Sequence, residues 1–117
     1  YQTLIKNGIT EDHTMGYSTH LGFRAGIAAP FYWFDLENNI QTKLKLVPFC
    51  AMDITPLHYR KESPDKAIKT LRNLMEKVND VGGLFVSLWH NESFSETERW
   101  RGWRVVYESL LAKASKS

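Results

Sequence analysis

The sequence predicts an α/β fold in which parallel strands alternate with helices. Two short apolar segments, residues 43–52 and 84–89, are rich in branched and aromatic side chains, which is typical of strands buried on both faces. Between them, residues 64–78 repeat apolar side chains at helical spacing. A strand, helix, strand order with connections of this length requires a crossover, and therefore predicts a parallel sheet.

The first part of the chain is expected to hold a helix end, a short strand and a loop. Residues 1–8 are typical of the last two turns of a helix, because Gly8 tolerates the left-handed conformation that ends many helices. No initiator Met precedes Tyr1, so we expect the chain to be the C-terminal portion of something longer, or the product of cleavage. Residues 9–15 fit a short strand, and the glycine-rich residues 16–30 fit a loop.

The remaining elements have clear start signals. Pro48 has no backbone N–H, so it marks either a strand start or an irregularity within the first apolar segment. Residues 63–65, Ser-Pro-Asp, supply an N-cap, a first-turn proline and a first-turn acid for the following helix. Residues 95–98 fit a capping box for a final helix whose apolar stripe includes Trp100. The lysine- and serine-rich residues 113–117 are expected to form a frayed tail.

Composition bounds the class of protein. With 117 residues, 43% of them hydrophobic and 13% aromatic, the chain has the size and apolar content of one domain with a core. The 15 basic and 13 acidic residues are scattered, so no basic block favours nucleic acid as a partner. No apolar stretch approaches the ~20 residues of a membrane span. The single cysteine, Cys50, has apolar neighbours that indicate a buried thiol.

The tripeptide Leu88-Trp89-His90 places an imidazole where a parallel strand ends. The carboxyl ends of such strands are where α/β folds perform chemistry, and imidazole exchanges a proton near neutral pH. A histidine at this place can equally be a hydrogen-bonded loop residue. Asp53 follows the other apolar segment, where its side chain can also serve only to stabilise a turn.

Four segments resemble the later half of polysaccharide deacetylases. They are Gly-Phe-Arg-Ala-Gly at 22–26 with Ala-Pro-Phe-Tyr-Trp at 29–33, Pro-Phe-Cys-Ala-Met-Asp at 48–53, Leu-Trp-His-Asn at 88–91, and Trp-Arg with Tyr at 103–107. The similarity covers nearly the whole chain. Members of this family fold as a distorted (β/α) barrel, the NodB-type homology domain, and use a divalent metal to remove acetyl groups from glycans. The resemblance implies that residues 1–117 are the C-terminal portion of one such barrel.

The resemblance also implies roles for three residues. His90 would protonate the leaving amine, Arg24 would hold a catalytic aspartate, and Asp53 would support the histidine. The family's Asp-Asp and His-x-x-x-His motifs, which supply the base and the metal ligands, do not occur in this sequence. A divalent metal, with zinc expected, would therefore be bound by upstream residues and not by this chain alone. The chain's own histidines and cysteine lack the close spacing of zinc motifs.

Amide hydrolysis requires a polarised carbonyl, an activated water and a proton for the leaving nitrogen. His90 can supply the proton, and a metal must do the rest. Arg24, if buried, would need an acidic partner, and otherwise it is an ordinary surface arginine. The consecutive aromatics Phe31, Tyr32 and Trp33 cannot all face inward, so at least one is expected to line a sugar groove, together with Trp89.

Two functions remain open from the sequence. The first is a metal-dependent hydrolase acting on an acetylated glycan, of which this is the later part. The second is a non-catalytic carbohydrate-binding or interaction domain derived from the same barrel. The resembled family is often found in the cell envelope or outside the cytoplasm, but this segment itself contains no signal peptide, so localisation stays open. An incomplete barrel would expose a strand edge, so self-association is expected.

Overall fold

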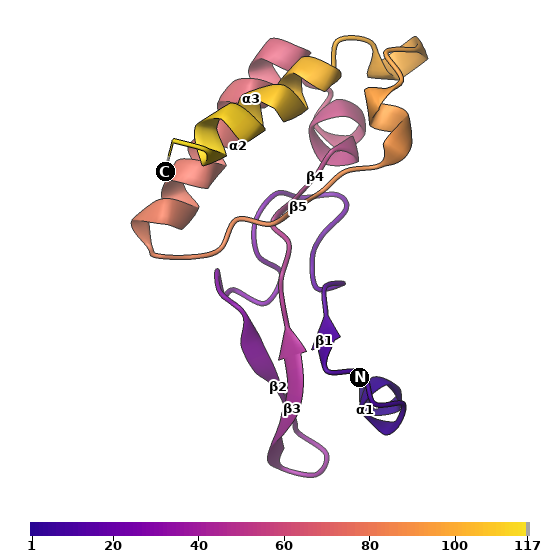
Figure 1. Ribbon diagram of the computed structural model, residues 1–117, viewed down its shortest axis with the longest axis vertical. Coiled ribbons are helices and arrows are strands. Elements are labelled where there is room, and N and C mark those ends of the chain that lie inside the picture. The colour runs from indigo at the N-terminus through magenta and orange to yellow at the C-terminus, as the bar shows by residue number, and fades with distance from the viewer. Residues whose placement is uncertain (117) are drawn as a thin grey trace.

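The computed structural model describes residues 1–116 and shows an elongated molecule. Its principal extents are 47 × 31 × 23 Å, and its radius of gyration is 16.0 Å. A compact chain of this length would have a radius of gyration of about 13 Å. Figure 1 shows the reason: the long helices gather at one end, and a strand hairpin extends away from them toward the other.

The extended end is a three-stranded mixed sheet in the order β1-β3-β2. Strand β1 (Glu11–Asp12) pairs in parallel with β3 (Ile40–Leu46), and β2 (Phe31–Asp35) pairs with β3 in the antiparallel direction. Helix α1 (Gln2–Lys6) lies beside this sheet (Figure 1). The helix end expected at residues 1–8 is present, and Gly8 adopts a φ of +76° after it.

The other end contains a strand, helix, strand unit. Strand β4 (Ala51–Met52) pairs in parallel with β5 (Ser87–Leu88), and α2 (Pro64–Asp80) connects them. The N-cap prediction for α2 is confirmed, since the Ser63 hydroxyl accepts a hydrogen bond from the amide of Lys66 at 3.3 Å. Three short turns complete this end: a π-helical turn, η1 (Thr55–Tyr59), and two 3₁₀ turns, η2 (Asn91–Phe94) and η3 (Glu98–Trp100).

The core lies between α2 and α3 (Arg104–Ala114), which pack against each other beside β4. Buried apolar side chains from these elements and from the turn before α3 form one cluster: Ala51, Ala67, Leu71, Trp100, Trp103, Val106 and Leu110. Trp100, expected in the apolar stripe of the final helix, is indeed a core residue, and Trp103 is buried beside it. None of the helices within residues 1–116 is long and apolar enough to cross a membrane.

The predicted (β/α) barrel is wrong: residues 1–116 form no barrel, but a mixed three-stranded sheet and a separate two-stranded parallel one. The expected strand over residues 43–52 is interrupted at residues 47–50, where Pro48 cannot donate a hydrogen bond to a ladder. The segment consequently joins two different sheets. Of the second expected strand, residues 84–89, only Ser87–Leu88 are paired, and Leu84 is 47% exposed.

The capping box expected at residues 95–98 is also not formed. Instead, the carboxylate of Glu96 accepts hydrogen bonds from the amides of Gly102 at 2.9 Å and Arg104 at 3.1 Å. The final helix therefore begins later, at Arg104. It also continues into the expected tail, because α3 includes Lys113, whose ammonium group lies 2.8 Å from the carboxylate of Glu76. Residue 117, at the end of that tail, lies outside the described residues.

Candidate functional site

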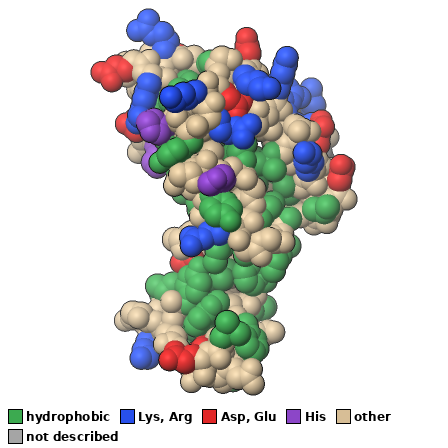
Figure 2. All heavy atoms as spheres, turned by 180° about the vertical axis from the view of Figure 1, so that it is seen from behind, with side chains coloured by type: hydrophobic (Ala, Val, Ile, Leu, Met, Phe, Trp, Pro, Cys, Tyr) green, Lys and Arg blue, Asp and Glu red, His purple; other side chains and the backbone are tan. Residues whose placement is uncertain are grey.

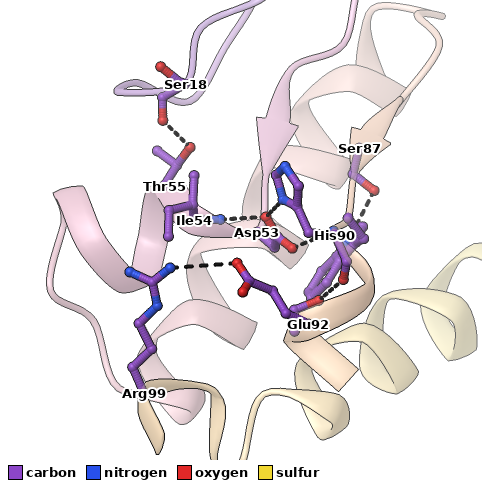
Figure 3. A network of polar contacts seen from close by, with 10 residues as sticks. Ser18, Asp53, Ile54, Thr55, Ser87, His90, Glu92 and Arg99 are labelled. Atoms are coloured by element: carbon purple, nitrogen blue, oxygen red, sulfur yellow. Dashed lines mark hydrogen bonds and ion pairs between the residues drawn. The ribbon is translucent and has the colours of Figure 1, made fainter. Parts of the chain in front are cut away.

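The two strand-end residues singled out by the sequence, Asp53 and His90, are in direct contact. Met52 of β4 pairs with Leu88 of β5, so both strands end at the same edge of the small parallel sheet. The amide of Asp53 continues the pairing by donating to the carbonyl of Leu88 at 3.0 Å. The imidazole Nδ1 of His90 then lies 2.8 Å from the Oδ1 atom of Asp53. Figure 3 draws this contact as a dashed line.

The Asp53 carboxylate is fully buried and is contacted by three N–H donors. Its Oδ2 accepts the backbone amide of His90 at 2.7 Å, and its Oδ1 accepts the amide of Ile54, also at 2.7 Å, besides the imidazole. The carboxylate therefore stabilises the local turn through two backbone amides, and it also contacts the imidazole of His90. Because a carboxylate accepts hydrogen bonds, Nδ1 of the imidazole carries the hydrogen of this contact.

The outer part of the His90 ring faces solvent. Its side chain is 48% exposed, while that of Asp53 is 0% exposed. The carbonyl of His90 accepts the hydroxyl of the buried Ser93 at 2.7 Å, at the start of η2. The residue is thus held through its amide, its carbonyl and Nδ1, and only Nε2 remains directed outward for exchange with a ligand.

Arg24 is exposed and lies in the loop between β1 and β2. Its guanidinium makes no hydrogen bond or ion pair with any residue in 1–116. The condition under which an acidic partner would be required, burial of the arginine, is therefore not met in this chain. Gly22, two residues earlier, is fixed by a hydrogen bond from its amide to the carbonyl of Cys50 at 2.8 Å, so the loop itself is anchored beside β4.

The aromatic residues proposed to bind sugar do not join His90. Phe31, Tyr32 and Trp33 lie on β2, in the other sheet, where Tyr32 is 52% exposed and the Trp33 ring contacts that of Tyr1 at 5.4 Å. As expected, the three do not all face inward.

Trp89 is next to His90 but half-buried. Its ring packs against Tyr107 at 5.2 Å and Phe94 at 6.0 Å, and its Nε1 donates to the Ser87 hydroxyl at 3.1 Å. These contacts attach β5 to α3, which makes Trp89 a packing residue in this structure.

Sequence reasoning missed Thr55. It is 0% exposed, and its hydroxyl donates to the carbonyl of Ser18 at 2.6 Å, linking the end of β4 to a loop 37 residues away (Figure 3). The only signal in the sequence was its place two residues after Asp53, at a strand end. Nothing in the sequence indicated its distant partner.

The residues at this site do not fit a metal centre by themselves. Within residues 1–116, no three His, Cys, Asp or Glu side chains gather around a common point. In addition, both oxygens of Asp53 are already used by N–H donors. What the arrangement can do is transfer a proton at an exposed Nε2 atom, with a buried carboxylate stabilising the charged imidazole.

No protein-family model, no curated protein and no solved structure matches the chain at a significant level. The similarity to polysaccharide deacetylases therefore stays a prediction from short motifs. Membership of the family is not shown by these comparisons.

Proposed function

We propose that this chain is part of a metal-dependent hydrolase that removes acetyl groups from a polysaccharide or other glycan. The observation that carries the proposal is the contact between the buried Asp53 carboxylate and the exposed His90 imidazole, where two parallel strands end. The contact between Asp53 and His90 does not depend on a barrel. The deacetylase-like motifs of the sequence contribute the substrate class, an acetylated glycan.

In this proposal, His90 is the general acid. With Nδ1–H held by Asp53, the charged imidazole presents Nε2–H outward, where a departing sugar nitrogen or oxygen can take the proton. Expelling an amide anion without that proton is prohibitively costly, and a positioned acid contributes roughly 10²–10⁴-fold in rate. Asp53 acts through the ring as a positioning residue.

The other tasks are assigned to groups outside this chain. Polarising the acetyl carbonyl and activating water are what a divalent metal supplies when bound, and the described residues do not gather the ligands for one. Arg24, exposed and unpaired within residues 1–116, is available to hold a carboxylate on such an outside segment.

The test is a histidine substitution in the full-length protein. His90→Ala should lower kcat for release of acetate from an acetylated chito-oligosaccharide by about 10²–10⁴-fold and leave the bound metal content unchanged. His58→Ala is the matched control, because His58 is also exposed but its side chain makes no hydrogen bond or ion pair within the described residues. An unchanged kcat, or an equal loss of metal in His90→Ala, would refute the acid role.

The second candidate, a non-catalytic carbohydrate-binding domain, is favoured by one observation. Tyr32 and Phe34 lie two positions apart on β2 and are 52% and 44% exposed. Both aromatic rings are therefore on the same face of the three-stranded sheet. Glycan binding without acetate release, abolished by Tyr32→Ala but not by His90→Ala, would support this candidate over the hydrolase.

A further inference from the structure

Residues 16–22 form a loop whose two ends are attached to neighbouring residues of the segment before β4. Before the loop, the carbonyl of Met15 accepts the amide of Phe49 at 3.0 Å; at its end, the amide of Gly22 donates to the carbonyl of Cys50 at 2.8 Å. Phe49 and Cys50 are consecutive, so the two ends of the loop are close together. Surface loops of 6–16 residues with close ends are frequently functional.

The start of this loop requires a glycine. A Cβ atom placed on Gly16 would come within 2.4 Å of the ring of Phe49, which is buried. Any larger residue would push the loop away from the irregular segment that leads to β4. The loop is therefore held closely against the part of the chain that ends in Asp53.

Thr55 holds the middle of the loop. Its hydroxyl donates to the carbonyl of Ser18 at 2.6 Å, and Thr55 itself is 0% exposed. Figure 3 shows this contact beside the pair formed by Asp53 and His90. Since Thr55 follows Asp53 by two residues, the same strand end that carries the carboxylate also fixes the loop.

The loop presents polar and aromatic side chains to solvent. Tyr17, Thr19 and His20 are all exposed. The rings of Tyr17 and His20 lie 5.4 Å apart, edge to face, and the Thr19 hydroxyl is 2.6 Å from Nδ1 of His20. An aromatic face with hydrogen-bonding groups beside it suits a sugar, which has apolar C–H faces and many hydroxyls.

We propose that Thr55 is a positioning residue, which holds the 16–22 loop beside the Asp53–His90 pair so that Tyr17 and His20 contact the glycan. The inference rests on the proposed function for its substrate class. It adds a residue that touches neither the glycan nor the reacting atoms, and it predicts an effect on glycan binding instead of on the chemical step.

The experiment compares Thr55→Val with Thr55→Ser in the full-length protein. Valine keeps the shape and removes the hydroxyl, whereas serine keeps the hydroxyl. Thr55→Val should raise KM for an acetylated chito-oligosaccharide by about three- to tenfold, the value of one hydrogen bond, with kcat and its pH profile unchanged. The KM of Thr55→Ser should stay within about twofold of the wild-type value. Hydrogen exchange at the amides of residues 17–22 should become faster in Thr55→Val alone.

The outcomes separate this inference from the proposed function. If the wild type is active and Thr55→Val has the same KM, or loses kcat at constant KM, the inference is overturned and the hydrolase stands. Calorimetric binding of triacetylchitotriose that is weaker in Thr55→Val, with no turnover by the wild type, supports the inference and overturns the hydrolase. If the wild type neither binds nor hydrolyses acetylated glycans, both are overturned.

Discussion

The carboxylate of Asp53 accepts hydrogen bonds from both the imidazole Nδ1 and the backbone amide of His90, at 2.8 and 2.7 Å. One buried group thus fixes the ring and the main chain of the same residue. Because both contacts come from His90, the orientation of the imidazole cannot change without loss of a hydrogen bond to a buried acceptor. The pair is therefore preorganised, which a general acid requires.

Replacing this carboxylate should impair both stability and activity. In Asp53→Asn, the N–H groups of the new amide face N–H donors that bind the carboxylate in the wild type. We therefore expect the free energy of unfolding to fall by about 1–3 kcal/mol. We also expect kcat to fall, because the charged imidazole loses its counter-ion. Urea denaturation and acetate release measure the two effects.

The matched control is Asp35→Asn. Asp35 is also a buried carboxylate and accepts the amides of Glu37 and Asn38, but it lies at the end of β2 in the three-stranded sheet, just before the hairpin turn. This variant should lose stability and keep the wild-type kcat. Equal losses of kcat in both variants would mean that the effect of Asp53→Asn is only a loss of folding.

Glu96, which precedes α3, should make the stability of the fold depend on pH. Hydrogen bonds from the amides of Gly102 and Arg104 lower the pKa of Glu96. A lowered pKa stabilises the fold above the ordinary pKa of glutamate, about 4.3, and this contribution disappears as the pH falls through the lowered value. The stability difference between wild type and Glu96→Gln should therefore be largest near neutral pH and shrink toward pH 3. Denaturation at both pH values measures it.

Glu98→Gln serves as the control for this experiment, since the Glu98 carboxylate makes no hydrogen bond or ion pair within residues 1–116. Its stability difference from the wild type should stay small at both pH values. A difference for Glu96→Gln that grows on acidification would contradict the assigned role.

The thiol of Cys50 should be unreactive in the folded protein. Burial raises the pKa of Cys50 to about 11, and the residue is 1% exposed. Because the thiolate is the reactive form, an aromatic disulfide reagent at pH 8 should label the native protein only slowly and the denatured protein at once. Ser95→Cys, at an exposed position, gives the rate for an accessible thiol. Native labelling of Cys50 at that rate would show that the segment before β4 opens.

The 117-residue chain alone should bind no zinc specifically. No three potential ligands converge within residues 1–116, and both oxygens of the Asp53 carboxylate already accept N–H donors. Calorimetry with zinc chloride should show only weak, non-stoichiometric heats. Stoichiometric binding in the micromolar range, lost in His90→Ala, would instead place the metal at the Asp53–His90 pair.

The sequence predicted those features that depend on neighbouring residues. Ser63, Pro64 and Asp65 carry a helix start in their own side chains, and α2 begins there. The positions of Asp53 and His90 followed from the ends of two apolar segments, and the parallel pairing of those ends brings the side chains together. Their contact was nevertheless expected only from the resemblance, because no local pattern states which acid meets which histidine.

The features that depend on distant partners could not be predicted. The apolar residues 43–52 look continuous, but the chain at Pro48 passes from one sheet to another, and composition does not reveal such a change of partner. The acid at residue 96 satisfies amides 6 and 8 residues later, beyond the spacing of a capping box. The contact between Thr55 and Ser18 spans 37 residues.

The pairing of Met52 with Leu88 has a consequence for how this protein can change in evolution. A one-residue slip of β4 against β5 would turn the carboxylate and the imidazole to opposite faces, whatever the rest of the fold did. Insertions or deletions within two positions of either strand end should therefore be far rarer among homologous chains than changes of length in the exposed turn at residues 36–39.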